Sequence, residues 1–333
     1  MSRQLREALQ KYCDAVDAVM ADNFIYGRCT GGTVGPRTIK FRFDYTPPFN
    51  FTEEQLKENR IRERLCAVLG VPAVELLALD GVCHIAMSNP YPYKETFESA
   101  MWSLGPSGLK DGEALAGINV ESGAPIIINF NHHIAHLLVT GNPGCGKTAL
   151  LRSICLSLLL ASNPESAFII AGEKLERAFP YDRVIRAGKT AHHQIIANTL
   201  ATIHRRQIQR KPRSEFPHVF VVVDEFTEFI YDTAVSMDDL MEIIRRGTEV
   251  NVHLICSTAY AHQKGVAETL NRLEFPLRLC GTQLDSPYDE DFNLQCGMFV
   301  VRLAQAGTKS VVIESCYVSR YDTFQIAQKG LTL

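Results

Sequence analysis

A glycine-rich octapeptide near the middle of the chain has the residue types and spacing of a phosphate-binding loop. Residues 141–148 read GNPGCGKT and match the pattern G-x-x-x-x-G-K-[ST] at every fixed position. The apolar, strand-like run IAHLLVT precedes the loop, and the helix-like run TALLRSICLSLLLA follows it within the same stretch. Glycines let successive backbone N–H groups point at phosphate oxygens, and the helix N-terminus adds its dipole. The loop therefore predicts a site for the phosphates of ATP.

The side chains of this loop have distinct expected roles. The Lys147 ammonium would reach the β- and γ-phosphates, and the Thr148 hydroxyl would bind Mg²⁺. Glycine-rich turns before helices also occur in proteins that bind no nucleotide, but the order of strand, loop and helix favours the nucleotide site. The candidate nucleotide-binding residues are Gly141, Asn142, Pro143, Gly144, Cys145, Gly146, Lys147, Thr148 and Ala149.

A second element ends in two adjacent acidic residues. Residues 218–223, HVFVVV, predict a buried strand, and Asp224 and Glu225 follow it directly. Open α/β sheets bind their ligands at the carboxyl ends of the strands. We expect Asp224 to hold Mg²⁺ through water and Glu225 to polarise the attacking water, as in an ATPase. Taken alone such a strand end is a weak signal, and its place downstream of a phosphate-binding loop strengthens it.

A third strand ends in hydroxyl groups. Residues 251–258 read NVHLICST and predict another buried strand of the same sheet. We expect Thr258, at its tip, to sense the γ-phosphate or the attacking water. The alternative is a threonine that only caps the following loop.

The elements around these motifs predict an α/β fold. From about residue 124, apolar strand-like runs alternate with helical stretches at 147–161, 190–209 and 236–247. Such alternation is typical of a mostly parallel sheet covered by helices on both faces. We expect residues 124–333 to form this P-loop ATPase domain.

The N-terminal part has a different organisation. Residues 1–26 predict one amphipathic helix, and residues 27–100 predict a small α+β domain. Within that domain we expect a strand at 38–45, a helix at 52–69, and a hairpin of strands 74–79 and 82–87 around Asp80-Gly81. The glycine-bearing stretch 101–123 is expected to be a linker.

Composition excludes several classes of protein. The 333 residues are 46% hydrophobic with a net charge of −3, which excludes a mainly disordered chain and a surface that coats nucleic acid throughout. The ten cysteines form no C-x-x-C pair, which argues against a zinc site. No apolar run approaches the ~18 residues of a membrane span, and no signal peptide is evident. We therefore expect a cytoplasmic protein without an integral membrane segment.

The same motifs resemble one family of ATPases. Residues 221–231, VVVDEFTEFIY, the strand at 251–258 and the run EFPLR at 274–278 resemble the FtsK/SpoIIIE-type DNA translocase motors of the HerA–FtsK superfamily. Residues 116–127, AGINVESGAPII, and 35–43, GPRTIKFRF, extend the resemblance, which covers about residues 25–320. It implies a RecA-like motor domain behind a small α+β domain, and a ring, expected to be hexameric, through which double-stranded DNA passes.

The chain departs from the family pattern at several points. The family's Thr-Gln-Arg-Pro motif is here Thr258-Ala259-Tyr260-Ala261, and the Arg of its Asp-Ser-Arg motif is replaced by Pro287. No winged-helix module or membrane anchor is evident. The resemblance implies an arginine acting across a subunit interface, for which Arg245 and Arg246 are candidates, and DNA-binding residues, for which Lys264 and Arg272 are candidates. The latter pair could equally be solvated surface charges.

These observations predict a ring-forming motor that hydrolyses ATP with Mg²⁺ and moves double-stranded DNA, with an unknown partner protein as a possible recruiter. Two alternatives stay open: a motor of the same type for protein export or conjugative transfer, and an ATP-binding oligomeric scaffold with little turnover.

Overall fold

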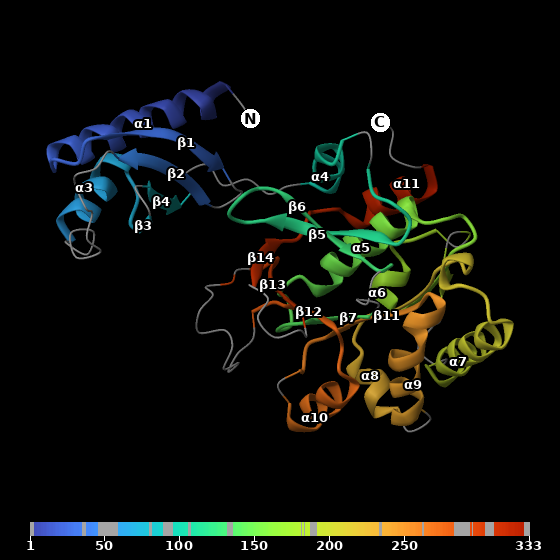
Figure 1. Ribbon diagram of the computed structural model, residues 1–333. Helices are drawn as coiled ribbons and strands as arrows, with labels where there is room; N and C mark the ends of the chain where they lie inside the picture. Colours follow the sequence, from blue (N-terminus) through green and yellow to red (C-terminus); the bar gives the residue numbers. More distant parts are fainter. Residues whose placement is uncertain are drawn as a thin grey trace. The chain divides into compact units, whose positions relative to one another are not determined.

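The structure is a computed structural model, and its chain divides into two compact units (Figure 1). Unit 1 comprises Met1–Lys94 with Asn119–Ala124, and unit 2 comprises Glu95–Ile118 with Pro125–Leu333. The residues described are 3–34, 38–45, 59–79, 82–88, 96–105, 108–131, 136–180, 182, 184–186, 192–232, 235–261, 263–282, 294, 296–303 and 310–329.

Unit 1 packs two helices on one face of an antiparallel sheet. The four strands lie in the order β1-β2-β4-β3. The side chains of β2 alternate, so that Ile39, Phe41 and Phe43 are buried among apolar residues of the two helices. The elements are α1 (Arg3–Asp22), β1 (Gly27–Val34), β2 (Thr38–Tyr45), α3 (Asn59–Leu69), β3 (Val74–Leu79) and β4 (Val82–Ser88).

The strand expected at 38–45 and the pairing of 74–79 with 82–87 are confirmed. The first helix is shorter than expected, because it ends at Asp22 instead of residue 26. The Asn23 side chain donates to the Val19 carbonyl, and Phe24 has a left-handed φ of 60°, which stops the helix. Residues 52–58 of the expected helix and the Asp80-Gly81 turn lie outside the described residues.

Unit 2 is built on a ten-stranded, mostly parallel sheet. Its order is β6-β5-β14-β13-β12-β7-β11-β10-β8-β9, and the run from β12 to β9 is parallel throughout. The strands are β5 (Glu113–Asn119), β6 (Pro125–Asn129), β7 (Leu137–Thr140), β8 (Ala167–Ala171), β9 (Ile185–Arg186), β10 (Val219–Val223), β11 (Val252–Thr258), β12 (Leu277–Cys280), β13 (Met298–Leu303) and β14 (Val311–Glu314). This arrangement confirms the expected fold class.

Helices cover both faces of this sheet (Figure 1). Along β10, Phe220 and Val222 join the core under one helical layer, and Val221 and Val223 join the core under the other. The first layer holds α4 (Phe97–Ser103), α5 (Lys147–Ala161), α6 (Glu173–Glu176) and α11 (Arg320–Lys329). The second holds α7 (His192–Gln209), α8 (Thr227–Tyr231), α9 (Met237–Gly247) and α10 (Lys264–Leu273).

The stretch 101–123, expected to be a linker, contributes a strand to the large sheet. Residues 113–119 form β5, and its central side chains are buried. A Cβ at Gly117 would lie 2.4 Å from the Glu314 carbonyl oxygen, so this glycine serves a close backbone approach. Gly117 therefore marks a tightly packed strand rather than a linker.

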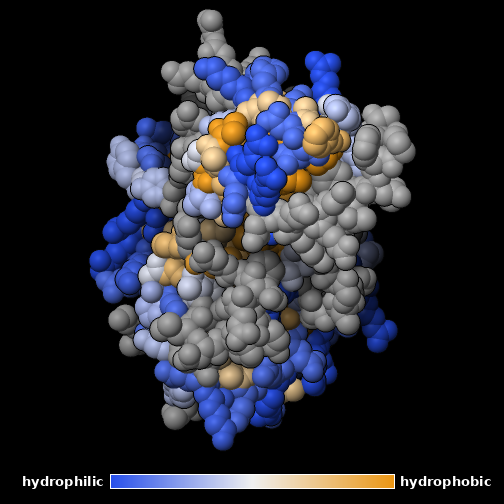
Figure 2. Space-filling view, turned by 90° about the vertical axis from the view of Figure 1, so that its left-hand side faces the viewer, coloured by the Kyte–Doolittle hydropathy of each residue, from blue (hydrophilic) through white to orange (hydrophobic). Residues whose placement is uncertain are grey.

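The surface is mixed in polarity. On the face in Figure 2, hydrophilic residues predominate among those drawn in colour, and apolar residues gather in smaller patches. Such patches are normal for folded domains. No helix in the described part of the chain is long and apolar enough to span a bilayer.

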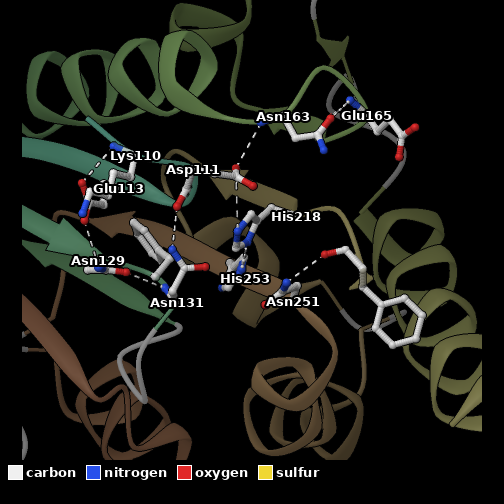
Figure 3. A network of polar contacts seen from close by, with 12 residues as sticks. Lys110, Asp111, Glu113, Asn129, Asn131, Asn163, Glu165, His218, Asn251 and His253 are labelled. Carbon is white, nitrogen blue, oxygen red and sulfur yellow. Dashed lines mark hydrogen bonds and ion pairs between the residues drawn. The ribbon is translucent and has the colours of Figure 1, made fainter. Parts of the chain in front are cut away.

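A polar network holds the amino ends of β10 and β11 (Figure 3). The buried rings of His218 and His253 share a hydrogen bond of 2.8 Å between Nδ1 and Nε2. Asp111 Oδ1 lies 3.9 Å from His218 Nε2, and the Asn251 side chain donates to the Phe216 carbonyl. Burial lowers the pKa of His218, which favours the neutral ring. The network fixes where the two strands begin.

A third buried histidine lies at the same edge. His136 Nδ1 accepts a hydrogen bond of 3.0 Å from the Leu254 N–H, and Thr248 lies 3.3 Å from its Nε2. Burial lowers the pKa of His136 to about 3. His136 therefore joins β7, β11 and the end of α9 only in its neutral form.

This depressed pKa predicts a loss of stability in mild acid. Between about pH 6.5 and 3 the unfolded state binds a proton at His136 that the folded state does not, so stability falls as the pH falls. The contribution is about 1.4 kcal/mol per pH unit at most. Urea unfolding of His136→Gln at pH 7 and pH 5 should show a smaller pH dependence than the wild type. His193→Gln, at an exposed histidine, is the control. Equal pH dependence in all three proteins would contradict this role.

Candidate nucleotide site

The phosphate-binding loop connects β7 to α5 in unit 2, where the sequence places it. Two glycines are required by geometry: a Cβ at Gly141 would lie 2.5 Å from Cys145 Sγ, and Gly146 has a φ of 105°. Gly146 is also the N-cap of α5 and leaves the first N–H groups of the helix without a side-chain cap. These free donors and the helix dipole favour an anion.

Lys147 lies inside this loop with its ammonium buried. Its Nζ donates to the carbonyl oxygens of Gly141 at 2.9 Å and Asn142 at 3.1 Å. The side chain is 5% exposed. The loop carbonyls thus hold a buried positive charge at the point where the helix N-terminus also favours negative charge.

Thr148, at the end of the phosphate-binding loop, contacts Asp224, at the end of β10. The Thr148 hydroxyl donates to Asp224 Oδ2 at 2.8 Å, although 76 residues separate them in the sequence. Asp224 follows β10, which is separated from β7 by β11 alone, so the parallel topology brings both to one sheet edge. A hydroxyl and a carboxylate are hard oxygen donors of the kind that Mg²⁺ takes in nucleotide sites. The two residues fit the expected metal.

Glu225 is held in an uncommon backbone conformation. Its φ of 63° is left-handed, which is uncommon for any residue other than glycine and recurs at functional sites. Burial, and then the charge of Asp224, raise the pKa of Glu225, while Lys147 and Lys174 oppose the shift. A carboxylate of raised pKa is better suited to accept a proton from water.

Two adjoining cavities surround these residues. The larger, of about 680 Å³, has the size of a small-ligand site, and the smaller is of about 200 Å³. The larger is lined by Pro143, Gly144, Gly146, Lys147, Thr148, Ala149, Arg152, Glu173, Lys174, Arg177, Glu225 and Arg320. The smaller is lined by Gly172, Glu173, Lys174, His192, Asp224, Glu225, Glu228 and Phe229. Glu225 lines both, so the candidate base faces the candidate nucleotide space.

Three arginines in the larger cavity were not anticipated from the sequence. Arg152 donates through Nη1 to the Val318 carbonyl at 3.2 Å, and Arg320 donates through Nε to the Arg177 carbonyl at 3.1 Å. Arg152 is four residues after Thr148 on α5, and this helical spacing was a usable signal. Arg177 and Arg320 come from distant segments, and no local pattern marks them.

The expected sensor Thr258 lies away from the cavities. Its buried hydroxyl lies 2.5 Å from the Thr227 hydroxyl, and it lines neither cavity. The preceding residue, Ser257, contacts Asp224 instead, with its Oγ 2.5 Å from Asp224 Oδ1. The sequence pattern predicts Thr258, whereas Ser257 is the residue whose hydroxyl touches the candidate metal ligand.

Four other candidates lie outside the site. Arg245 and Arg246 are exposed in the last turn of α9, which leads to the amino end of β11, at the sheet edge opposite Lys147. Arg246 Nη1 pairs with Glu242 at 2.9 Å. Lys264 and Arg272 are both exposed on α10.

Comparisons with known proteins agree with the sequence resemblance. The model of the FtsK/SpoIIIE family matches residues 109–171. DNA translocase FtsK of Mycobacterium leprae (strain TN) is 19% identical over 285 residues, which cover 73% of this chain and 33% of that protein. ESX secretion system protein EccC of Geobacillus thermodenitrificans (strain NG80-2) is 27% identical over 182 residues, 46% of this chain and 12% of that protein. The chain thus spans a third or less of the length of these curated relatives.

A solved structure shows the same fold. The pCW3 conjugation coupling protein TcpA, in its monomer form with ATPγS, matches with a TM-score of 0.55 and 17% identity. The match covers 96% of this chain and 99% of that chain. At this identity the likeness concerns the fold alone. The chain therefore has a RecA-like α/β fold, and the FtsK/SpoIIIE family model matches the part of it that includes the phosphate-binding loop.

The arginines of the larger cavity generate a prediction. Arg152→Ala and Arg320→Ala should each weaken binding of a fluorescent, non-hydrolysable ATP analogue by about two- to tenfold, the worth of one hydrogen bond. Fluorescence anisotropy measures the affinity. Arg205→Ala, at an exposed arginine of α7, is the matched control. If both variants bind as tightly as this control, the arginines do not contact the nucleotide.

Proposed function

We propose that the chain is an ATP-hydrolysing motor that assembles into a ring, expected to be hexameric, and moves double-stranded DNA through its centre. The observation that carries the proposal is the convergence of Lys147, Thr148, Asp224 and Glu225 at one sheet edge. The motor would be unit 2, which comprises Glu95–Ile118 and Pro125–Leu333, and unit 1 would be the small α+β domain.

Each of these residues has a definite task in the proposed reaction. Lys147 binds the β- and γ-phosphates, and Mg²⁺, when bound, neutralises phosphate charge. Thr148 and Asp224 would hold that ion. Glu225 orients the attacking water and accepts its proton, for which its raised pKa is suited.

The ring would complete the site with a residue from a neighbouring copy. Arg245 and Arg246 lie at the sheet edge opposite Lys147, so they do not serve the site of their own chain. In a head-to-tail ring, each copy places one surface patch against a different patch of the next, so residues remote from their own site can reach that of a neighbour. We assign the trans arginine to this exposed pair, which would stabilise charge in the transition state.

Contact with DNA would be local. The net charge of −3 provides no general attraction for phosphate, but Lys264 and Arg272 are exposed on α10. Ring symmetry repeats such a pair once per subunit, which builds a basic track from few residues. The similarity to the DNA translocase FtsK over 285 residues supports this cargo.

The principal alternative is a protein cargo. The relative EccC, named as a protein of the ESX secretion system, is more identical to this chain than FtsK is, although over a shorter segment. The same nucleotide site would then drive protein export, or conjugative transfer, with a recruiting partner. The remaining alternative is an ATP-binding scaffold with little turnover.

Steady-state ATP hydrolysis with and without long linear double-stranded DNA tests the proposal. We expect DNA to stimulate turnover and Glu225→Gln to lower it by about 100-fold or more, since it removes the general base. Glu225→Gln should still bind ATP, because Lys147 and the loop are intact. Glu249→Gln, at an exposed glutamate of the opposite edge, is the matched control.

The other outcomes identify the alternatives. Turnover that is indifferent to DNA would contradict the DNA motor and favour a protein cargo. ATP binding without turnover in the wild type would contradict the role of Glu225 and favour the scaffold.

A further inference from the structure

Ser257 contacts both acidic residues at the end of β10. It is the penultimate residue of β11 and is fully buried. Its hydroxyl donates to Asp224 Oδ1 at 2.5 Å and accepts the Glu225 N–H at 3.3 Å. Its carbonyl accepts the Phe226 N–H at 2.6 Å. One residue thus binds three consecutive residues of the neighbouring segment.

The parallel pairing of the two strands explains these contacts. Val223 pairs with Cys256 in the register of β10 and β11, so the next residues, Asp224 and Ser257, also lie beside each other. Both lie at the carboxyl ends of strands that are buried along their whole length. The hydroxyl therefore meets the carboxylate where solvent cannot replace it.

The Asp224 carboxylate is oriented from two sides. Thr148 donates to Oδ2 at 2.8 Å, and Ser257 donates to Oδ1 at 2.5 Å. The last torsion of an aspartate side chain is otherwise broad, so two donors on different oxygens fix the carboxylate plane. Asp224 is 7% exposed and borders the smaller cavity, so its remaining lone pairs can serve a ligand there.

Ser257 also fixes the left-handed turn at Glu225. A left-handed residue that is not glycine persists only where its surroundings determine it. The Ser257 hydroxyl accepts the N–H of Glu225, and the Ser257 carbonyl accepts the next N–H along the chain. Both backbone donors at the turn are therefore held by one residue.

We propose that Ser257 is a positioning residue that orients Asp224 for the metal ion and fixes the turn of Glu225. It acts through these two residues, because it lines neither cavity itself. The proposal rests on the proposed function, since it assumes a Mg²⁺–nucleotide complex at this site. Ser257 thereby lowers the Mg²⁺ concentration at which Mg²⁺-dependent nucleotide binding is half-saturated.

Nucleotide binding at varied Mg²⁺ concentration tests this role without any turnover. The probe is a fluorescent, non-hydrolysable ATP analogue, titrated with the full chain in EDTA and then with added Mg²⁺. Loss of a group that orients a metal ligand typically costs 10- to 100-fold in metal affinity. Ser257→Ala should therefore raise the half-saturating Mg²⁺ concentration about tenfold, while affinity in EDTA stays unchanged because the loop is intact.

Three further variants separate positioning from packing. Ser257→Thr keeps the hydroxyl, so its half-saturating Mg²⁺ concentration should equal that of the wild type. Ser257→Cys has a similar shape but a weak donor, so its half-saturating Mg²⁺ concentration should be raised as in the alanine variant. Ser153→Ala is the matched control, because Ser153 is fully buried and its hydroxyl has no hydrogen-bond partner among the described residues. If Ser257→Ala does not fold, the cysteine variant carries the test.

The outcomes distinguish this inference from the proposed function. A wild type whose nucleotide binding does not respond to Mg²⁺ would overturn the proposed function and the role of Ser257 with it. A wild type that responds, with Ser257→Ala and Ser257→Cys indistinguishable from it, would overturn the role of Ser257 alone.

Discussion

A buried carboxylate needs hydrogen-bond partners, and the candidate site is built around the paired carboxylate of Asp224. Asp224 is almost inaccessible to solvent, and it receives hydroxyl hydrogen bonds from Thr148 and Ser257. An unpaired charge at this depth would be costly. The pairing therefore fixes the tip of β10 relative to both the phosphate-binding loop and the tip of β11. Glu225 follows directly, so its place facing the cavity depends on the same contacts.

The opposite edge of the sheet makes this arrangement possible. The strands can bring their tips together only if their beginnings are also in register. The hydrogen-bonded rings of His218 and His253, and the Asn251 side chain bonded to the Phe216 carbonyl, hold the amino ends of β10 and β11. His136 connects this edge to β7, which leads into the loop. Neutral side chains suit this role, since burial disfavours the charged form of a histidine. The amino ends of the strands thus support the sheet, and the carboxyl ends carry the candidate nucleotide site.

The sequence predicted what is local and missed what depends on tertiary contacts. The loop at 141–148 and the acidic strand end were recognisable because each is a contiguous pattern of residue types. The sequence does not distinguish Ser257 from Thr258, because strand alternation alone does not show which of the two hydroxyls faces the Asp224 carboxylate. Arg177 and Arg320 reach the cavity from segments that only the folded chain brings together. The glycines of the stretch 101–123 make residues 113–119 resemble a linker in the sequence, because the Glu314 carbonyl that packs against Gly117 lies about 200 residues further along the chain.

The most direct test of the central claim is whether ATP turnover moves the protein along DNA. A triplex-displacement assay measures release of a third strand from a long duplex when a motor passes. We predict release with ATP and the wild-type chain, and none with the non-hydrolysable analogue or with Glu225→Gln. ATP hydrolysis at full rate without release of the third strand would contradict the account of this site as a DNA motor.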